Sequence, residues 1–217
     1  MKEIIITYVL SYIIIIISAF IYLVLGYNDL NFFVDNICIY ILLIYYLITI
    51  IYLYKKNKRT EKKLILKKYV PLISLGISIA IIYNTLLFKF FPKIIVTNNS
   101  LIIAIISSGI IGPIFEEIIF RYIFYNRLKK KYSIRKAIII NNIIFALIHI
   151  NPIKVLYAFI LGQVLTISYE KYKNIKAPIV IHIAANTIIL FLVEYNLIAL
   201  LLAIINLIIN ILIITKE

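Results

Sequence analysis

Long apolar runs, separated by short polar or basic stretches, set the strongest limit on how this chain can fold. A helix needs about 20 mostly apolar residues to cross the hydrocarbon core of a bilayer. By this criterion the runs predict eight spans, near residues 4–25, 36–54, 70–91, 100–126, 136–151, 153–170, 177–194 and 196–214. The predicted fold is therefore an all-α polytopic membrane protein, with about eight transmembrane helices in a lipid bilayer.

The composition excludes a soluble domain. The chain is 64% hydrophobic with a mean hydropathy of +1.07, whereas soluble domains are about 45–50% apolar. The lone cysteine, Cys38, excludes an internal disulfide and a cluster of thiolate metal ligands. The first run, from Ile4 to Leu25, is longer than a signal-peptide core and lacks a small-residue cleavage site. We expect it to be a retained first transmembrane helix.

The positive charges alternate along the chain. Of 23 lysines and arginines, 19 lie in alternate loops: Lys2, the segments 55–68, 127–136 and 170–176, and Lys216. The opposite loops hold only Lys93 and Lys154. This asymmetry follows the positive-inside rule and predicts an even number of spans, with both termini cytoplasmic in a bacterial cytoplasmic membrane. Basic loops of this kind anchor to lipid headgroups, so no nucleic-acid partner is expected.

Two glutamates and an arginine interrupt the apolar stretch "GIIGPIFEEIIFRYIFY" (109–125). One ionised group at a helix centre costs at least about 2.5 kcal/mol, so these residues need a reason to be there. Glu117 and Arg121 are spaced i, i+4 with the acid first, which favours an intrahelical ion pair. Glu116 is rotated by about 100° and lacks that partner, which makes it the candidate general base. The glycines and proline just before it allow close helix approach or a kink.

Both histidines lie in apolar segments with a possible partner four residues away. "IIFALIHIN" places Phe145 and His149 on one helix face, and "VIHIAANT" does the same for His182 and Asn186. An imidazole and an amide on adjacent turns can both point at a metal-bound water or a carbonyl oxygen. A lone buried histidine is more often structural. Two imidazoles and a carboxylate, here His149, His182 and Glu116, also form a common zinc ligand set, so a divalent metal such as Zn²⁺ is expected.

Three short motifs carry a resemblance to a known family. They read "EEIIFR" (116–121), "FALIH" (145–149) and "HIAAN" (182–186). In this order they match the patterns E-E-x-x-x-R, F-x-x-x-H and H-x-x-x-N. The chain thereby resembles the CPBP family, the CAAX proteases and bacteriocin-processing enzymes, also called Abi-type intramembrane metalloproteases. The resemblance covers about residues 100–190, and the first three spans match only as hydrophobic helices.

The resemblance implies roles for seven residues. The catalytic ones are Glu116, His149, His182 and Asn186, and the supporting ones are Glu117, Arg121 and Phe145. Glu116 would activate the attacking water, and His149 and His182 would bind or orient that water through a divalent metal. Asn186 would help to stabilise the oxyanion.

The chain is expected to divide into three parts. Residues 1–99 hold N-terminal helices and a basic cytoplasmic loop, 100–195 the catalytic core, and 196–217 the last helix and tail. The leading hypothesis is an intramembrane endopeptidase acting on membrane-associated peptides or proteins, in peptide maturation or self-immunity. The alternatives are a non-catalytic scaffold or immunity-type binding protein, and a small transporter in which buried Glu and His relay protons. The sequence leaves the oligomeric state open.

The span boundaries place the site residues at different depths. If the fifth span starts at Ile138, His149 lies near the outer side, Glu116 in the middle, and His182 near the cytoplasmic side. These side chains meet only if the helices are tilted, staggered or begin outside the bilayer. Ser133 could cap a fifth helix that begins in the cytoplasm, which would bring His149 toward the others.

Overall fold

The computed structural model describes residues 2–88, 101–149, 151–191 and 197–216, and these residues form helices and loops with no strand. The long helices are α1 (Lys2–Val24), α3 (Ile39–Lys56), α4 (Tyr69–Phe88), the continuous helix Leu101–Leu128, α8 (Ile134–Leu147), α9 (Pro152–Tyr172), α10 (Lys176–Ile189) and α11 (Leu197–Lys216). Each predicted span corresponds to one of them, which confirms the all-α prediction. Short elements precede two: α2 (Leu30–Phe32) and the π-helical η1 (Phe33–Cys38) lead into α3, and the 3₁₀ turn η2 (Leu66–Lys68) leads into α4.

Not every helix is long enough to cross a membrane by itself. Among the described residues, five segments are long and apolar enough: Ile6–Val24, Ile39–Lys56, Leu66–Leu86, Leu101–Leu128 and Pro152–Tyr172. Helices α8 and α10 have 14 residues each, which span only about 21 Å at 1.5 Å per residue. Helices α8 and α10 end at Leu147 and Ile189, before the predicted ends at 151 and 194, and residues 150 and 192–194 lie outside the described residues. Lys89, Lys93 and the predicted boundaries at 91 and 100 lie outside the described residues.

The helix Leu101–Leu128 changes its winding around the two glutamates. It runs through α5 (Leu101–Ala104), the π-helical η3 (Ile105–Ile111), α6 (Gly112–Glu117), the π-helical η4 (Ile118–Tyr125) and α7 (Asn126–Leu128). Stretches of π-helix often mark functional sites. In η3 the backbone N–H of Gly112 donates to the carbonyl of Ser107, five residues back. The next donor in that register is Pro113, which has no N–H, so the carbonyl of Ser108 is left for another partner.

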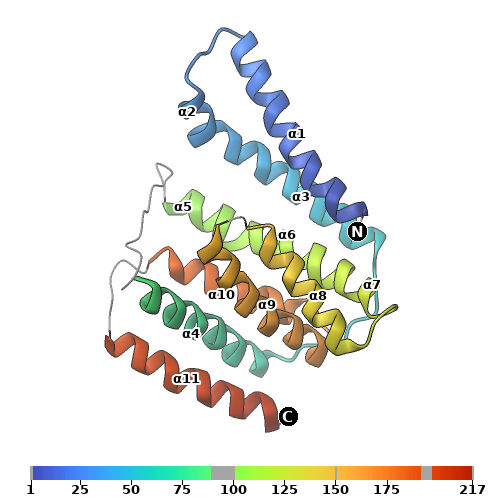
Figure 1. Ribbon diagram of the computed structural model, residues 1–217, viewed down its shortest axis with the longest axis vertical. Helices are drawn as coiled ribbons and strands as arrows, with labels where there is room; N and C mark the ends of the chain where they lie inside the picture. The colour runs from blue at the N-terminus through green and yellow to red at the C-terminus, as the bar shows by residue number, and fades with distance from the viewer. Residues whose placement is uncertain (1, 89–100, 150, 192–196, 217) are drawn as a thin grey trace.

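Helix α10 occupies the centre of the bundle (Figure 1). It packs against α4 on one side and against η3 and α6 on the other, and it also contacts α9. Helix α8 pairs with α9, and α11 packs on the outer side of α4. Helices α1 and α3 form a hairpin that meets the bundle where α3 contacts η3, α6 and η4. The helices that carry the three motifs are therefore neighbours in the interior.

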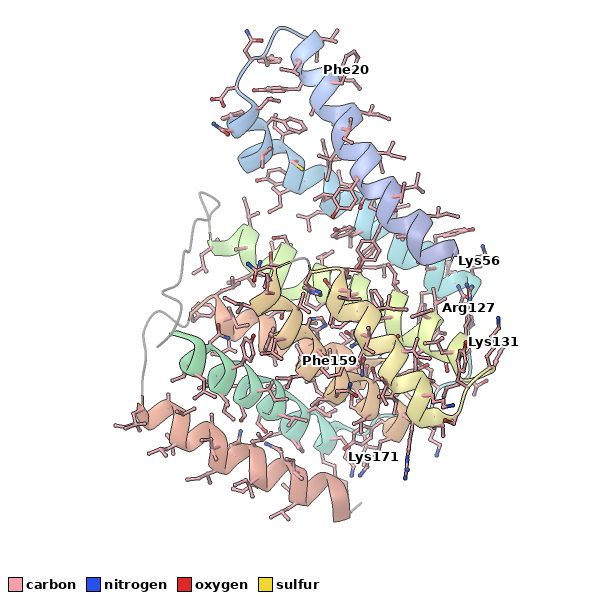
Figure 2. The ribbon with its side chains drawn as sticks, viewed as in Figure 1. Phe20, Lys56, Arg127, Lys131, Phe159 and Lys171 are labelled. Atoms are coloured by element: carbon pink, nitrogen blue, oxygen red, sulfur yellow. The ribbon has the colours of Figure 1, made fainter. Side chains whose placement is uncertain are left out.

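The charged loops gather at one end of the bundle. Figure 2 shows Lys56, Arg127, Lys131 and Lys171 at the same end. Helix α1 begins and α11 ends at this end as well (Figure 1). This arrangement agrees with the alternation of basic loops seen in the sequence, and the side of the membrane on which the end lies stays a prediction.

The basic loop between α3 and α4 is bound to the bundle. The backbone N–H of Arg59 donates to the hydroxyl of Tyr122 at 2.9 Å, and Glu61 accepts from the backbone N–H of Ile175 at 3.0 Å. Burial raises the pKa of the Glu61 carboxyl, while this hydrogen bond acts in the opposite direction. The loop thus fixes the start of α10, the helix that carries the third motif.

Two glycines let other helices approach α10 at backbone distance. A Cβ on Gly76 of α4 would lie 2.2 Å from the carbonyl oxygen of Ile181, and one on Gly109 of η3 would lie 2.9 Å from Oγ1 of Thr187. Helix α10 is therefore held closely on two sides, which fixes the height of His182 and Asn186 in the bundle.

Candidate active site

His182 lies between the two glutamates of the first motif. Its Nδ1 is 2.8 Å from Oε1 of Glu117, and its Nε2 is 3.8 Å from Oε2 of Glu116. A carboxylate can only accept hydrogen bonds, so Nδ1 must carry the hydrogen. The distance to Glu116 is too long for a hydrogen bond. The imidazole therefore turns its Nε2 toward Glu116 without a hydrogen bond to it.

Arg121 completes a buried set of charges with Glu117. Its Nη1 donates to Oε1 of Glu117 at 2.8 Å, and both side chains are fully buried. Its Nε donates to Thr166 at 3.3 Å and its Nη2 to the carbonyl of Gly162 at 3.4 Å. The predicted ion pair is confirmed. Glu117 binds the arginine and the imidazole together, and this orients His182.

Phe145 connects the second motif to the other two. Its ring lies edge-on to His149 at 5.2 Å and to His182 at 6.1 Å between ring centroids. The guanidinium of Arg121 lies over the same ring, 4.1 Å from its centroid. The predicted pairing of Phe145 and His149 on one face is confirmed, and the phenyl ring contacts both imidazoles.

His149 follows the end of α8 and is half-buried. Its Nδ1 lies 3.0 Å from the carbonyl oxygen of Phe145. At the other end of the helix, Ser133 occupies the N-cap position, but its side chain makes no capping hydrogen bond. The expected Ser133 cap is therefore wrong as a hydrogen bond, although α8 does begin earlier than Ile138. The site assembles by the packing of short, staggered helices.

Asn186 is anchored on the helix that carries the glutamates. Its Nδ2 donates to the carbonyl of Ser108 at 3.2 Å. This is the carbonyl that Pro113 leaves without a backbone donor. The next residue of α10, Thr187, donates to the carbonyl of Gly109 at 3.4 Å. The amide of Asn186 has a second N–H, which remains for another acceptor.

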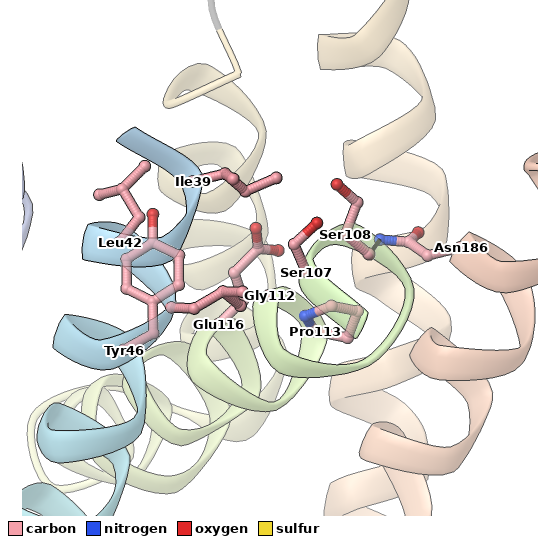
Figure 3. A pocket seen from close by; sticks show the side chains of 10 residues that line it. Ile39, Leu42, Tyr46, Ser107, Ser108, Gly112, Pro113, Glu116 and Asn186 are labelled. Atoms are coloured by element: carbon pink, nitrogen blue, oxygen red, sulfur yellow. Dashed lines mark hydrogen bonds between the residues drawn. The ribbon is translucent and has the colours of Figure 1, made fainter. Parts of the chain in front are cut away.

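A cavity of about 330 Å³ joins Glu116 and Asn186. Its other lining residues are Ser107, Ser108, Gly112 and Pro113 of the central helix and Ile39, Leu42, Leu43 and Tyr46 of α3. Figure 3 shows the carboxylate of Glu116 between the α3 side chains and the two serines. Among the described residues, neither imidazole lines this cavity. His182 is next to it, because its Nε2 lies 3.8 Å from Oε2 of Glu116, which does line it.

Three parts of the site were missed in the sequence. The α3 wall consists of ordinary apolar residues of a transmembrane helix, which carry no signature. The contacts of His182 with Glu117 and of Arg121 with Thr166 join residues 65 and 45 positions apart, beyond the reach of helical spacing. The sequence offered one signal for the third part, the carbonyl of Ser108 that Asn186 binds. Pro113 has no N–H, so a carbonyl in the preceding turn is left without a backbone donor.

The donors only partly fit the expected metal. Both imidazoles use Nδ1 toward an acceptor of the protein, which leaves each Nε2 free, as in histidines that bind metals. Within the described part of the chain, however, no three His, Cys, Asp or Glu side chains lie close enough to hold one ion. Glu116 and His182 approach each other. The ring of Phe145 contacts both His149 and His182. The Zn²⁺ set of Glu116, His149 and His182 therefore stays a prediction.

Comparisons with known proteins place the site within a family segment. Residues 98–188 match the family described as "Type II CAAX prenyl endopeptidase Rce1-like". The chain is also 35% identical over 88 residues to "Putative membrane peptidase YdiL" of Bacillus subtilis (strain 168). These residues cover 41% of this chain and 36% of that protein, so the match spans about a third of the relative's length. No solved structure matches the chain significantly. Both matches agree with the three motifs, and residues 98–188 of this chain are thus similar to CAAX-protease-like membrane peptidases.

Proposed function

We propose that the protein is an intramembrane endopeptidase that hydrolyses peptide bonds of membrane-associated proteins or peptides. The observation that carries this proposal is the state of Glu116. Its carboxylate lines the cavity, its Oε2 is buried without a hydrogen-bond partner among the described residues, and its side chain is 24% exposed. A buried charge without its own cation is costly and serves no structural purpose here, whereas a general base needs this combination of burial and access.

The reaction can be assigned to side chains of this chain. Glu116 takes a proton from a water in the cavity as the water oxygen bonds to the scissile carbonyl carbon. The free N–H of Asn186 donates to the oxyanion that develops. Glu116 then returns the proton to the amide nitrogen as the C–N bond breaks. His182, fixed by Glu117, holds its Nε2 beside Oε2 of Glu116 and so helps to keep the carboxylate in place.

A divalent ion, with Zn²⁺ as the expected one, is the cofactor that we propose for this site. Glu116, His149 and His182 would hold it, and it would supply a Lewis acid that polarises the carbonyl. Dialysis against a chelator should abolish cleavage, and re-addition of Zn²⁺ should restore it. Elemental analysis should find bound metal in the wild type and lose it in His182→Ala. An equal metal content in both proteins would contradict this ligand set.

The walls of the cavity favour an apolar peptide segment as the substrate. The α3 side is formed by Ile39, Leu42, Leu43 and Tyr46, and the opposite side by Ser107 and Ser108. Among the lining residues that the structure describes, Glu116 is the one that carries a charge. A role in peptide maturation or self-immunity, in a bacterial cytoplasmic membrane with both termini cytoplasmic, rests on the family resemblance and the charge pattern.

The test uses a deletion strain that carries either the wild-type gene or Glu116→Gln at matched membrane levels. Mass spectrometry compares the N- and C-termini of membrane and secreted peptides. Specific termini should disappear in the mutant, because loss of a general base slows turnover by about 10²–10⁴-fold. The control is Glu170→Gln, at the basic end where this glutamate pairs with Lys129 and Lys173, and it should keep the wild-type profile.

Identical profiles for the wild type and Glu116→Gln would reject the enzyme. If the mutant also rescued the phenotype of the deletion, the chain would act by binding, as a membrane scaffold or immunity-type protein.

A further inference from the structure

Tyr8 of α1 has a buried hydroxyl with no hydrogen-bond partner among the described residues. Buried polar side chains nearly always find a partner, and an unsatisfied one costs about 1–3 kcal/mol. Tyr8 also lies outside the segment 98–188 that matches the family. Neither the motifs nor the match gives a reason for a tyrosine here, so its position in the bundle must supply one.

The ring of Tyr8 packs beside the two glutamates. It lies edge-on to Phe115 at 5.8 Å and tilted against Phe120 at 6.3 Å between centroids. These two phenylalanines flank Glu116 and Glu117 in the central helix. The ring of Tyr8 thus packs on the part of the central helix that carries the proposed general base.

A second unpartnered atom lies in the same region. Oε2 of Glu116 is also buried without a hydrogen-bond partner among the described residues. A phenol donor and a carboxylate acceptor therefore share one poorly solvated region, each without another partner.

We propose that Tyr8 is a positioning residue of the active site, whose hydroxyl hydrogen-bonds through one bound water to the buried oxygen of Glu116. Ordered waters regularly bridge buried polar groups in this way. The bridge holds one carboxylate oxygen in place and leaves the other to face the cavity. The inference rests on the proposed peptidase function. It gives α1 a role in the chemistry, in addition to the cavity wall that α3 provides.

Tyr157 of α9 offers a matched control. Its hydroxyl is likewise buried without a hydrogen-bond partner among the described residues, and its ring packs against Tyr83 at 4.7 Å. Tyr157 packs against the apolar cluster that includes Leu72, Leu161 and Ile181. Tyr157→Phe should therefore leave cleavage within about two-fold of wild type and should not lower the melting temperature, since removal of an unsatisfied hydroxyl is neutral or stabilising.

The kinetic experiment uses purified full-length protein in detergent micelles and a set of internally quenched peptides with apolar centres. Rates are measured on the peptide that the wild type cleaves best. Tyr8→Phe should lower kcat by about ten-fold or more with KM unchanged, because a hydrogen bond to a charged group is lost without any substrate contact. Turnover equal to that of Tyr157→Phe would overturn the proposal.

A second readout does not depend on activity. Melting temperatures are compared for Tyr8→Phe, Glu116→Ala and the double variant. A bridge between the two side chains predicts that Tyr8→Phe lowers the melting temperature in the wild type and has no such effect once Glu116 is removed. Equal effects in both backgrounds would reject the bridge. If the wild type cleaves no more than Glu116→Gln, the peptidase function fails, and this cycle still decides whether Tyr8 and Glu116 are coupled.

Discussion

The central helix and the N-terminal hairpin differ sharply in how they are packed. In the hairpin, 11% of the apolar window of α1 and 6% of that of α3 are buried, against 39% for Leu101–Leu128. All eight residues of η4 are buried. The hairpin meets the bundle mainly through aromatic contacts, such as Tyr46 stacked on Phe115 at 4.0 Å and Tyr54 on Tyr122 at 5.1 Å.

This difference separates two tasks. The buried helices interlock their polar groups, since Glu117 alone binds both Arg121 and His182. Changes there should cost stability first. The hairpin closes one side of the cavity, and most of its surface faces the surroundings. Changes in the α3 wall of the cavity should alter substrate binding while the fold stays intact.

The largest effect is expected for Arg121→Gln. The substitution leaves the carboxylate of Glu117 buried without its cation, which costs about 3–5 kcal/mol of unfolding free energy. Arg59→Gln is the control, because Arg59 lies in the basic loop with its guanidinium 5.4 Å from the ring centroid of Tyr122. Its loss should cost under about 1 kcal/mol. Denaturation in micelles measures the unfolding free energy of both variants. Equal decreases in the two would show that the buried charges do not stabilise the core.

Local periodicity explains what the sequence could predict. The pairs Glu117–Arg121 and Phe145–His149 are each four residues apart on one helix, so a fixed geometry relates them once the helix is assigned. Apolar run length likewise revealed each helix. These predictions need no knowledge of the tertiary structure.

The remaining features depend on tertiary contacts. The bond between His182 and Glu117 requires the crossing of α10 and the central helix, where Gly109 lies against Thr187. Gly76 of α4 holds α10 from the other side. Helix α10 begins at Lys176 because the basic loop binds its start, and apolar run length does not encode this.

A smaller effect is expected for Gly76→Ala in α4. The new Cβ would lie 2.2 Å from the carbonyl oxygen of Ile181, and a backbone atom can move away only if α10 moves. We expect a loss of about 1–3 kcal/mol together with slower cleavage, since His182 is the next residue. Ile73→Ala, on the exposed face of α4 at 41% exposure, should change neither. Unchanged stability and cleavage in Gly76→Ala would mean that α4 does not position α10.

Leu42→Trp tests the hairpin as a cavity wall. The larger side chain would enter the space beside Glu116, and cleavage of apolar peptides should lose about ten-fold in kcat/KM, a cost of about 1.4 kcal/mol in transition-state binding. The melting temperature should stay unchanged, because α3 is so little buried. Leu47→Trp is the control, since Leu47 lies on an exposed face of α3. If both variants slow cleavage equally, substrate does not occupy this cavity.

The smallest effect is expected where α11 meets α4. Asn210 is 2% exposed, and its Nδ2 donates to the hydroxyl of Ser74 at 2.8 Å. Hydrogen bonds between membrane helices contribute only about 0.6 kcal/mol on average, because the separated helices also find partners. Asn210→Leu should therefore destabilise the protein by about that amount, measured by denaturation in micelles, and leave cleavage unchanged. Ser74 lies two residues before Gly76 in α4. A clear loss of cleavage would therefore show that α11 acts through α4 on the position of α10. The outer helix on this side would then contribute to the site, as the hairpin does on the other side.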